Sequence, residues 1–185
     1  MLPADVSSFS KQYLHGNSFF LFQTIAKEHP FLFWMDTSLR FKTSKLDQLF
    51  ANVTKLGLMA DDMGSGLIST IAERTLQTTF NYLNEDPCAY ATQREKQGGF
   101  LLIYANPFVT QYFLKPLVSC ALSFGCMDPN RYSLLFLGCP PNDEPFKGQL
   151  CHRYDQSIVG ILFTRLFHRN MRNHAVSRDY FFFDK

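Results

Sequence analysis

The sequence predicts a single α/β domain, an open sheet with flanking helices, extending over residues 1–185. Segments with strand character alternate with segments of helical periodicity, an order typical of α/β proteins. Apolar residues make up 46% of the chain and charged residues 18%, a balance that supports a sizeable core and argues against intrinsic disorder. The sequence contains no repeat, low-complexity tract or Pro-, Gly- or Ser-rich linker that would indicate a second domain.

The first predicted elements lie on either side of His29-Pro30. Ser18 is a candidate cap for a helix that runs to about Glu28, and the proline stops that helix. The apolar run from Phe31 to Met35 predicts a strand that is covered on both faces. Asp36 is therefore expected at the carboxyl end of a central strand, with its side chain in an open cleft. Further predicted elements are a helix near residues 46–53, a strand near 57–60 and a helix over 73–83.

The segment that begins at Gly98-Gly99 is the clearest unit of the chain. The glycines open a strand over residues 100–104, and Asn106-Pro107 then supplies a capping residue with proline at the first helical position. The helix is expected to be disturbed at Pro116 and to stop at Gly125. Later predicted elements are a strand at 134–137, a helix from Asp155 to about Phe167 and a buried terminal strand at 180–183.

Charge and hydropathy exclude some classes of partner. The formal net charge of +2 is too small to attract nucleic acid or an anionic membrane through the overall field of the protein. No stretch reaches the roughly 20 apolar residues of a membrane-spanning helix, and the start of the chain has no basic region followed by an apolar one. The chain is therefore expected to carry neither a membrane anchor nor a signal peptide.

The cysteines are concentrated in one region. Four of the five lie between residues 120 and 151, and none forms a CxxC pair or a Cys/His zinc spacing. Their clustering in a loop-rich stretch predicts bridges from Cys120 to Cys126 and from Cys139 to Cys151, with Cys88 free or bonded elsewhere. Five buried free thiols are the alternative.

The sequon Asn52-Val53-Thr54 is a second indication of a secretory setting. It is an acceptor sequence for N-glycosylation, and it falls on a helix that is expected to be exposed. Such a tripeptide also occurs by chance, so it does not decide the compartment alone.

Three polar residues are candidates for chemistry. Asp36, directly after an apolar strand, can hold a divalent cation or a ribose hydroxyl, or can be an ordinary turn aspartate. Asp155 is expected at a helix N-cap, where its carboxylate is stabilised by backbone N–H groups and the helix dipole. His152, three residues earlier, is a metal ligand, a hydrogen-bond donor or simply a loop residue. Each of the three therefore has a structural interpretation as well as a functional one.

Three blocks together resemble a known family. The blocks are Phe33–Phe41 (FWMDTSLRF), Gln97–Tyr104 (QGGFLLIY) and Cys151–Ser157 (CHRYDQS). Their order and separation are similar to those of a largely uncharacterised animal family in the nucleotide-diphospho-sugar transferase superfamily, and the likeness covers about residues 10–170. The resemblance implies a GT-A-like, Rossmann-like open sheet and a lumenal setting in the Golgi or outside the cell.

The resemblance also implies roles for individual residues. Asp36 takes the place of the metal-binding DxD motif, so Mn²⁺ or Mg²⁺ and a nucleotide-sugar are the implied cofactor and donor. The first two blocks then place the donor near Asp36, Ser38, Arg40, Gly98 and Gly99. Asp155 would orient or deprotonate a hydroxyl of a glycan or glycoprotein acceptor, with His152 beside it as a catalytic group or a metal ligand.

Two departures from the family pattern qualify that function. Ser38 stands where a second aspartate is usual, and loss of a carboxylate weakens a site for a hard cation or shifts ligation to a residue such as His152. Only about 30 residues precede Phe31, so the usual N-terminal nucleotide-binding segment is expected to be missing. The alternatives are an inactive binding or structural protein that keeps part of the fold and, ranked last, a hydrolase that uses Asp36 and Asp155 as paired carboxylates.

Overall fold

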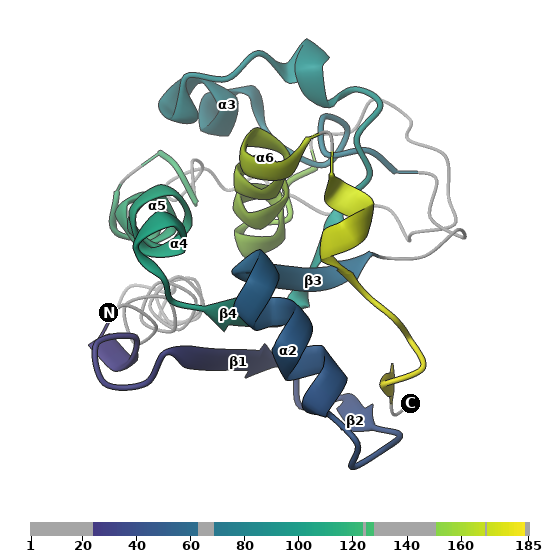
Figure 1. Cartoon of the computed structure of the whole chain (residues 1–185). Helices are drawn as coiled ribbons and strands as arrows, with labels where there is room; N and C mark the ends of the chain where they lie inside the picture. Colours follow the sequence, from purple (N-terminus) through teal and green to yellow (C-terminus); the bar gives the residue numbers. More distant parts are fainter. Residues whose placement is uncertain (1–23, 63–68, 124, 128–150, 169, 184–185) are drawn as a thin grey trace, which may run out of the picture.

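A computed structural model describes residues 24–62, 69–123, 125–127, 151–168 and 170–183 of the protein (Figure 1). This part of the chain is a mixed α/β structure, which confirms the predicted class. The strands are β1 (Phe31–Met35), β2 (Leu39–Phe41), β3 (Leu58–Asp62), β4 (Lys96–Tyr104), β5 (Ala175–Val176) and β6 (Phe181–Phe183). The main helices are α2 (Asp47–Leu56), α3 (Gln77–Leu83), α5 (Lys115–Leu122) and α6 (Asp155–Phe167).

The strands form a small mixed sheet. In the described part of the chain its order is β1-β4-β3-β5, with β4 antiparallel to both neighbours and β3 parallel to β5. The register pairs Met35 of β1 with Phe100 of β4, and the pairing of β3 with β4 shifts between Ala60 and Asp62. Strands β2 and β6 form a separate antiparallel pair.

Strand β1 has the predicted bounds but not the predicted environment. It lies at the edge of the described sheet rather than at its centre. Phe31 and Phe33 are 39% and 37% exposed, while Leu32 is buried. The expectation of a central strand covered on both faces is therefore wrong for the described residues. A continuous apolar run does not distinguish a covered strand from one whose aromatic rings pack against each other at a surface, as Phe31 does with Phe50 and Tyr104.

Strand β4 separates two apolar clusters, because its side chains alternate between the faces of the sheet. Leu101 and Ile103 pack in the cluster that contains α5 and α6. Phe100 and Leu102 pack in the cluster that contains α2, β2 and β6. The ring of Phe100 stacks on Phe181 of β6 with 4.5 Å between centroids. Figure 1 shows α2 and α6 with the strands between them.

The helical segment after β4 is disturbed where proline predicts it. Asn106 caps a single turn, α4 (Pro107–Val109), by accepting a hydrogen bond from the Val109 N–H at 2.9 Å. A π-helical stretch, η2 (Thr110–Leu114), joins it to α5. Pro116 has no N–H to donate and its ring crowds the carbonyl four residues earlier, and a wider turn relieves both conflicts.

Other predicted elements are recovered to different degrees. Helix α6 has its predicted bounds, and Phe181–Phe183 is a strand as expected, although Phe182 is 43% exposed. Helix α3 begins at Gln77 rather than at Glu73, whose carboxylate instead accepts a hydrogen bond from the Thr70 N–H at 2.7 Å. Most of the helix expected from Ser18 and the strand expected at 134–137 lie outside the described residues.

The predicted bridge between Cys120 and Cys126 is present. It ties the end of α5 to the buried Cys126, and the carbonyl of Cys126 accepts a hydrogen bond from the Thr79 hydroxyl at 2.9 Å. Cys88 is free and exposed. Cys151 is disulfide-bonded, but Cys139 lies outside the described residues, so that pairing stays a prediction.

Among the described helices, none combines the length and the apolar character needed to cross a bilayer.

Candidate functional site

Asp36 follows β1 directly and starts a tight turn. Its N–H donates to the Gly99 carbonyl at 2.8 Å, and its own carbonyl accepts from the Leu39 N–H at 3.0 Å. The backbone is therefore fixed at the sheet and across the turn. The side chain is exposed, and its carboxylate makes no hydrogen bond or ion pair with any described residue. Asp36 thus combines a fixed position with an available negative charge.

Gly99 leaves space for the Asp36 carboxylate. A Cβ atom on Gly99 would lie 2.3 Å from Oδ2 of Asp36 and 2.6 Å from its Cγ, far inside van der Waals contact. Any side chain on this position of β4 would therefore displace the carboxylate. Gly99, the second glycine of the pair noted in the sequence, thus lets the Asp36 carboxylate lie against the strand.

Asp155 lies over the neighbouring glycine. A Cβ atom on Gly98 would be 3.4 Å from Oδ2 of Asp155, an ordinary contact. Asp155 is the first residue of α6, and its Oδ1 accepts a hydrogen bond from the Gln156 N–H at 2.9 Å. The predicted N-cap position belongs instead to Tyr154, whose φ of 45° turns the chain into the helix. Asp155 therefore lies one position further into α6 than expected, still in its first turn.

The structure brings the two aspartates into one region. They contact consecutive residues of one strand, and adjacent Cα atoms are 3.8 Å apart, so their carboxylates are separated by no more than about 13 Å. That limit is on the scale of a substrate-sized site, although successive residues of an extended strand present opposite faces of the sheet. Asp36 and Asp155, which are far apart in the sequence, thus flank the Gly98-Gly99 step of β4.

His152 is not part of this exposed surface. It is 2% exposed; its Nδ1 accepts from the Leu76 N–H at 3.4 Å, and its Nε2 lies 2.9 Å from the Met127 carbonyl. Burial lowers the pKa of the His152 imidazole to about 4, with the Met127 carbonyl as an opposing influence. The neutral ring with its proton on Nε2 satisfies both backbone groups. A metal-binding or catalytic role for His152 would require these bonds to break.

Ser38 and Arg40, the other predicted donor-binding residues, are both exposed on the turn. Nη1 of Arg40 donates to the carbonyl of Thr37 and, at 2.8 Å, to that of Leu39. The guanidinium thus stabilises the turn that carries Asp36 and Ser38. It remains at the surface beside them.

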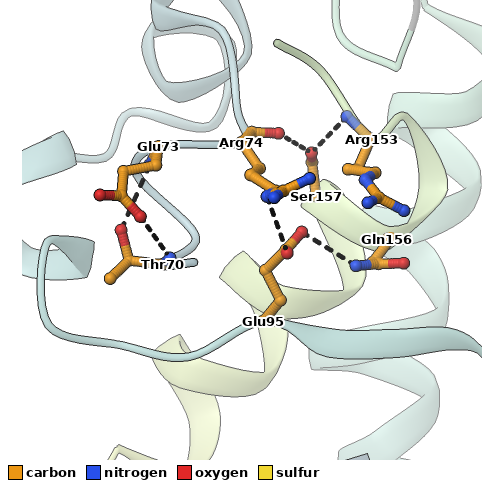
Figure 2. Close-up of polar contacts among 7 residues, drawn as sticks. All are labelled: Thr70, Glu73, Arg74, Glu95, Arg153, Gln156 and Ser157. Atoms are coloured by element: carbon orange, nitrogen blue, oxygen red, sulfur yellow. Dashed lines mark hydrogen bonds and ion pairs between the residues drawn. The ribbon is translucent and has the colours of Figure 1, made fainter. Parts of the chain in front are cut away.

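A buried polar network that the sequence does not reveal supports the first turn of α6 (Figure 2). Arg74 and Glu95 form an ion pair with 3.5 Å between Nε and Oε2, and both side chains are at most 4% exposed. Nε2 of Gln156 donates to Oε1 of Glu95 at 2.9 Å. Burial raises the pKa of the Glu95 carboxyl, and the charges of Arg153 and Arg74 oppose that rise.

The same network fixes the segment before the helix. The Ser157 hydroxyl donates to the Arg74 carbonyl at 2.8 Å and accepts from the Arg153 N–H at 3.1 Å (Figure 2). Asp155 is therefore positioned through its neighbours Gln156 and Ser157. No spacing rule pairs Arg74 with Glu95, and both have polar or charged neighbours in the sequence, so no local signal marks them as buried.

The candidate ligands for a divalent cation lie on the exposed turn, at Asp36 and Ser38. In the described part of the chain, no group of three His, Cys, Asp or Glu side chains is arranged to hold a metal ion. Mg²⁺, however, is often bound by one or two carboxylates with water and substrate phosphates completing its shell. Asp36 fits that second pattern, because its carboxylate is exposed and unbonded.

The side chains of Asn52 and Thr54 in the sequon form hydrogen bonds within α2. Asn52 is half-buried, and its Oδ1 accepts from Nε2 of Gln48 at 2.8 Å. The Thr54 hydroxyl donates to the Phe50 carbonyl at 2.8 Å. Glycosylation at Asn52 stays a prediction.

Comparison of the chain with family models, curated proteins and solved structures gives no match.

Proposed function

We propose that the chain is a GT-A-like domain derived from a glycosyltransferase, with Asp36 on the donor side of its site and Asp155 on the acceptor side. The observation that carries the proposal is the placement of the two carboxylates against Gly99 and Gly98. Transfer of a sugar from a nucleotide-sugar needs charge stabilisation at the departing diphosphate and a base at the acceptor hydroxyl. Two carboxylates on one strand step suit those tasks.

Asp36, with the Ser38 hydroxyl on the same turn, would hold Mn²⁺ or Mg²⁺ on the donor diphosphate. When bound, such a cation would neutralise negative charge on the leaving group. The Asp36 carboxylate is exposed, and the absence of a side chain on Gly99 leaves room for it against β4. The Arg40 guanidinium holds the turn through two carbonyls and adds positive charge beside it.

Asp155 would accept the proton of the attacking acceptor hydroxyl. Its place in the first turn of α6 favours the carboxylate form through the helix dipole. The Arg74–Glu95–Gln156 network fixes that turn, which keeps the base in one orientation. The acceptor would be a glycan or glycoprotein, in a lumenal or secreted setting where a bridge such as Cys120–Cys126 persists.

A binding or structural protein without catalysis is the second candidate. It is favoured by the lack of a three-residue metal group among the described side chains and by the engagement of both His152 nitrogens. Such a protein would use the same exposed surface, but its binding would not depend on a metal ion.

Calorimetric titration with UDP and GDP, with Mn²⁺ or with EDTA, separates the two functions. A donor site should bind one of the nucleotides only with Mn²⁺, and Asp36→Asn should weaken that binding at least about tenfold, as loss of a charged contact does. Asp47→Asn removes an exposed acid on α2 and serves as the control. Binding that persists in EDTA would support the non-catalytic protein. Absence of nucleotide binding, or an Asp36→Asn variant that binds normally, would contradict the donor site.

The role of Asp155 is tested with the same assay and a second readout. Asp155→Asn should bind Mn²⁺ and nucleotide within about twofold of the parent, since a general base contributes to the chemical step rather than to donor affinity. Release of nucleoside diphosphate from the matching nucleotide-sugar should fall by two orders of magnitude or more. Unchanged turnover in this variant would show that Asp155 only stabilises α6.

A further inference from the structure

Tyr154 has a backbone conformation that large side chains rarely adopt. Among the described residues, only two that are not glycine have a positive φ, Asn84 and Tyr154. Asn84 ends α3 in the left-handed conformation that asparagine often takes after a helix. Tyr154, with φ 45° and ψ −112°, lies outside that region, in a conformation that only glycine adopts without steric cost. The chain therefore keeps a tyrosine at a position that favours glycine.

The start of α6 does not explain the tyrosine. Tyr154 is the N-cap residue, yet its side chain forms no capping hydrogen bond with the described part of the helix. The side chains that stabilise an N-cap are those of serine, threonine, aspartate and asparagine. Glycine is also tolerated well at an N-cap, and here it would remove the strain. The benefit of the tyrosine therefore lies in its ring.

Packing within the protein accounts for only part of the ring. Tyr154 is 37% exposed, whereas the core aromatics Tyr90 and Phe163 are 2% and 0% exposed. The Tyr154 ring meets the His152 ring at 63°, with 5.2 Å between centroids. One such aromatic contact contributes modestly to stability. A substantial part of the Tyr154 side chain thus remains at the surface, in contact with solvent.

The segment that carries the ring is fixed by hydrogen bonds. Both ring nitrogens of His152 lie within hydrogen-bonding distance of backbone groups. The Arg153 N–H donates to the Arg74 carbonyl at 3.2 Å and to the Ser157 hydroxyl at 3.1 Å. Strained conformations persist only where the surrounding structure over-determines them. Tyr154 is therefore held in one backbone conformation, and only its few side-chain torsions remain to be ordered when a ligand binds.

The ring stands next to the acceptor side of the proposed site. Tyr154 directly precedes Asp155, whose Oδ2 would lie 3.4 Å from a Cβ atom on Gly98. Backbone strain in folded proteins is concentrated at active sites and ligand contacts. A strained and partly exposed aromatic residue beside a candidate general base is therefore expected to contact the molecule on which that base acts.

We propose that Tyr154 is a specificity-determining residue that contacts a pyranose ring of the acceptor glycan. The proposal rests on the proposed function, because that function makes the acceptor a carbohydrate. A pyranose presents a face of C–H bonds, and the face of an aromatic ring carries the negative part of its quadrupole. The two faces attract each other, while the sugar hydroxyls at the rim bond to water or to polar groups. The contact needs the face of the Tyr154 ring and does not need its hydroxyl.

The test is titration of the whole chain with the methyl pyranosides of glucose, galactose, mannose and N-acetylglucosamine. EDTA is present and nucleotide is absent, so a cation at Asp36 does not contribute, and the backbone amide shifts of residues 152–157 report occupancy. We expect saturable binding of at least one pyranoside in the millimolar range. Tyr154→Phe should bind it within about twofold of the parent, and Tyr154→Ala should weaken it about tenfold. The matched control is Tyr112→Ala, which removes a 54% exposed ring on η2 and should bind like the parent.

Urea denaturation separates contact with a ligand from packing within the protein. Tyr154→Gly should unfold at a urea concentration equal to or above that of the parent, and above that of Tyr154→Ala, because glycine relieves the cost of the positive φ. The same variant should lose pyranoside binding as much as Tyr154→Ala does. A midpoint of Tyr154→Gly well below that of the parent would show that the tyrosine is kept for packing, and the proposal would be wrong.

Failure of this contact is distinguishable from failure of the donor site. Absence of saturable binding for all the pyranosides, or unchanged binding in Tyr154→Ala, would overturn the role of Tyr154 even where a nucleotide binds with Mn²⁺. Weaker nucleotide binding in Tyr154→Ala, with pyranoside binding unchanged, would also overturn it, because the ring would then contact a nucleobase. Pyranoside binding that depends on Tyr154, in a chain that binds no nucleotide, would support the contact and contradict the donor site alone.

Discussion

The turn at residues 36–40 and the segment at residues 151–157 are held by the protein in different ways. The polar residues of the turn are exposed, and the Arg40 guanidinium donates to two carbonyls of the turn itself. The later segment is tied to distant parts of the chain, with His152 bonded to Leu76 and Met127. Substitutions in the later segment and its network should therefore reduce stability, whereas substitutions of the exposed polar residues of the turn should change binding alone.

The largest effect is expected from the buried ion pair behind the later segment. Arg74→Ala removes the guanidinium that forms an ion pair with the buried Glu95 carboxylate and should reduce the free energy of unfolding by about 3–5 kcal/mol. Urea denaturation measures the change. Asp36→Ala, at the exposed turn, should shift the unfolding free energy by about 0.5 kcal/mol or less. Similar losses in the two variants would remove the contrast between the regions.

The next effect is a pH dependence from His152. Its pKa is about 4 in the folded protein and about 6.5 when unfolded, so below pH 6.5 the unfolded chain binds a proton that the folded one does not. Its contribution to stability is complete above pH 6.5 and is lost as the pH falls towards 4. The total is about 3 kcal/mol.

Urea denaturation at several pH values from 7 to 4 measures this loss. His152→Gln should remove the part that comes from His152, because an amide does not titrate in this range. His174, whose pKa is also lowered by burial, should supply a remaining dependence in the same direction. His29→Ala, at an exposed position, is the control and should follow the parent curve. A parent protein whose stability is flat between pH 6.5 and 4 would show that His152 is accessible to protons, and hence to ligands.

Only a small effect on stability is expected at the glycine pair. Gly99→Ala places a methyl group on the Asp36 carboxylate and forces it to turn away, while Gly98→Ala makes only ordinary contacts. Because Asp36 is exposed and can move into water, both variants should unfold within about 1 kcal/mol of the parent. The ¹³C shift of the Asp36 carboxyl should change in Gly99→Ala alone. Equal shifts in both variants would contradict the close approach at Gly99.

Local signals in the sequence predict much of the fold. Phe31–Met35 and Asp155–Phe167 have the predicted bounds, because an apolar run and a periodic segment each specify an element. The edge position of β1 was not predictable, since strand order depends on pairing between residues about 70 positions apart. The short strand β2 also escaped prediction, because it exists through its pairing with β6.

The sequence identified residues of the candidate site, but it did not reveal the role of each one. Asp36 follows a recognisable strand, and Gly98-Gly99 stands out in the sequence. The burial of His152 depends on Leu76 and Met127, which no local pattern connects to it. The residues of the Arg74–Glu95 pair likewise meet only when the chain has folded.

The most direct test of the account is the paramagnetic broadening of backbone amide signals by substoichiometric Mn²⁺. The account predicts that broadening centres on Asp36, Ser38 and Gly99, and that it disappears in Asp36→Asn while remaining in Asp47→Asn. Broadening centred on another acidic residue, or an unchanged pattern in Asp36→Asn, would contradict a cation site at the end of β1.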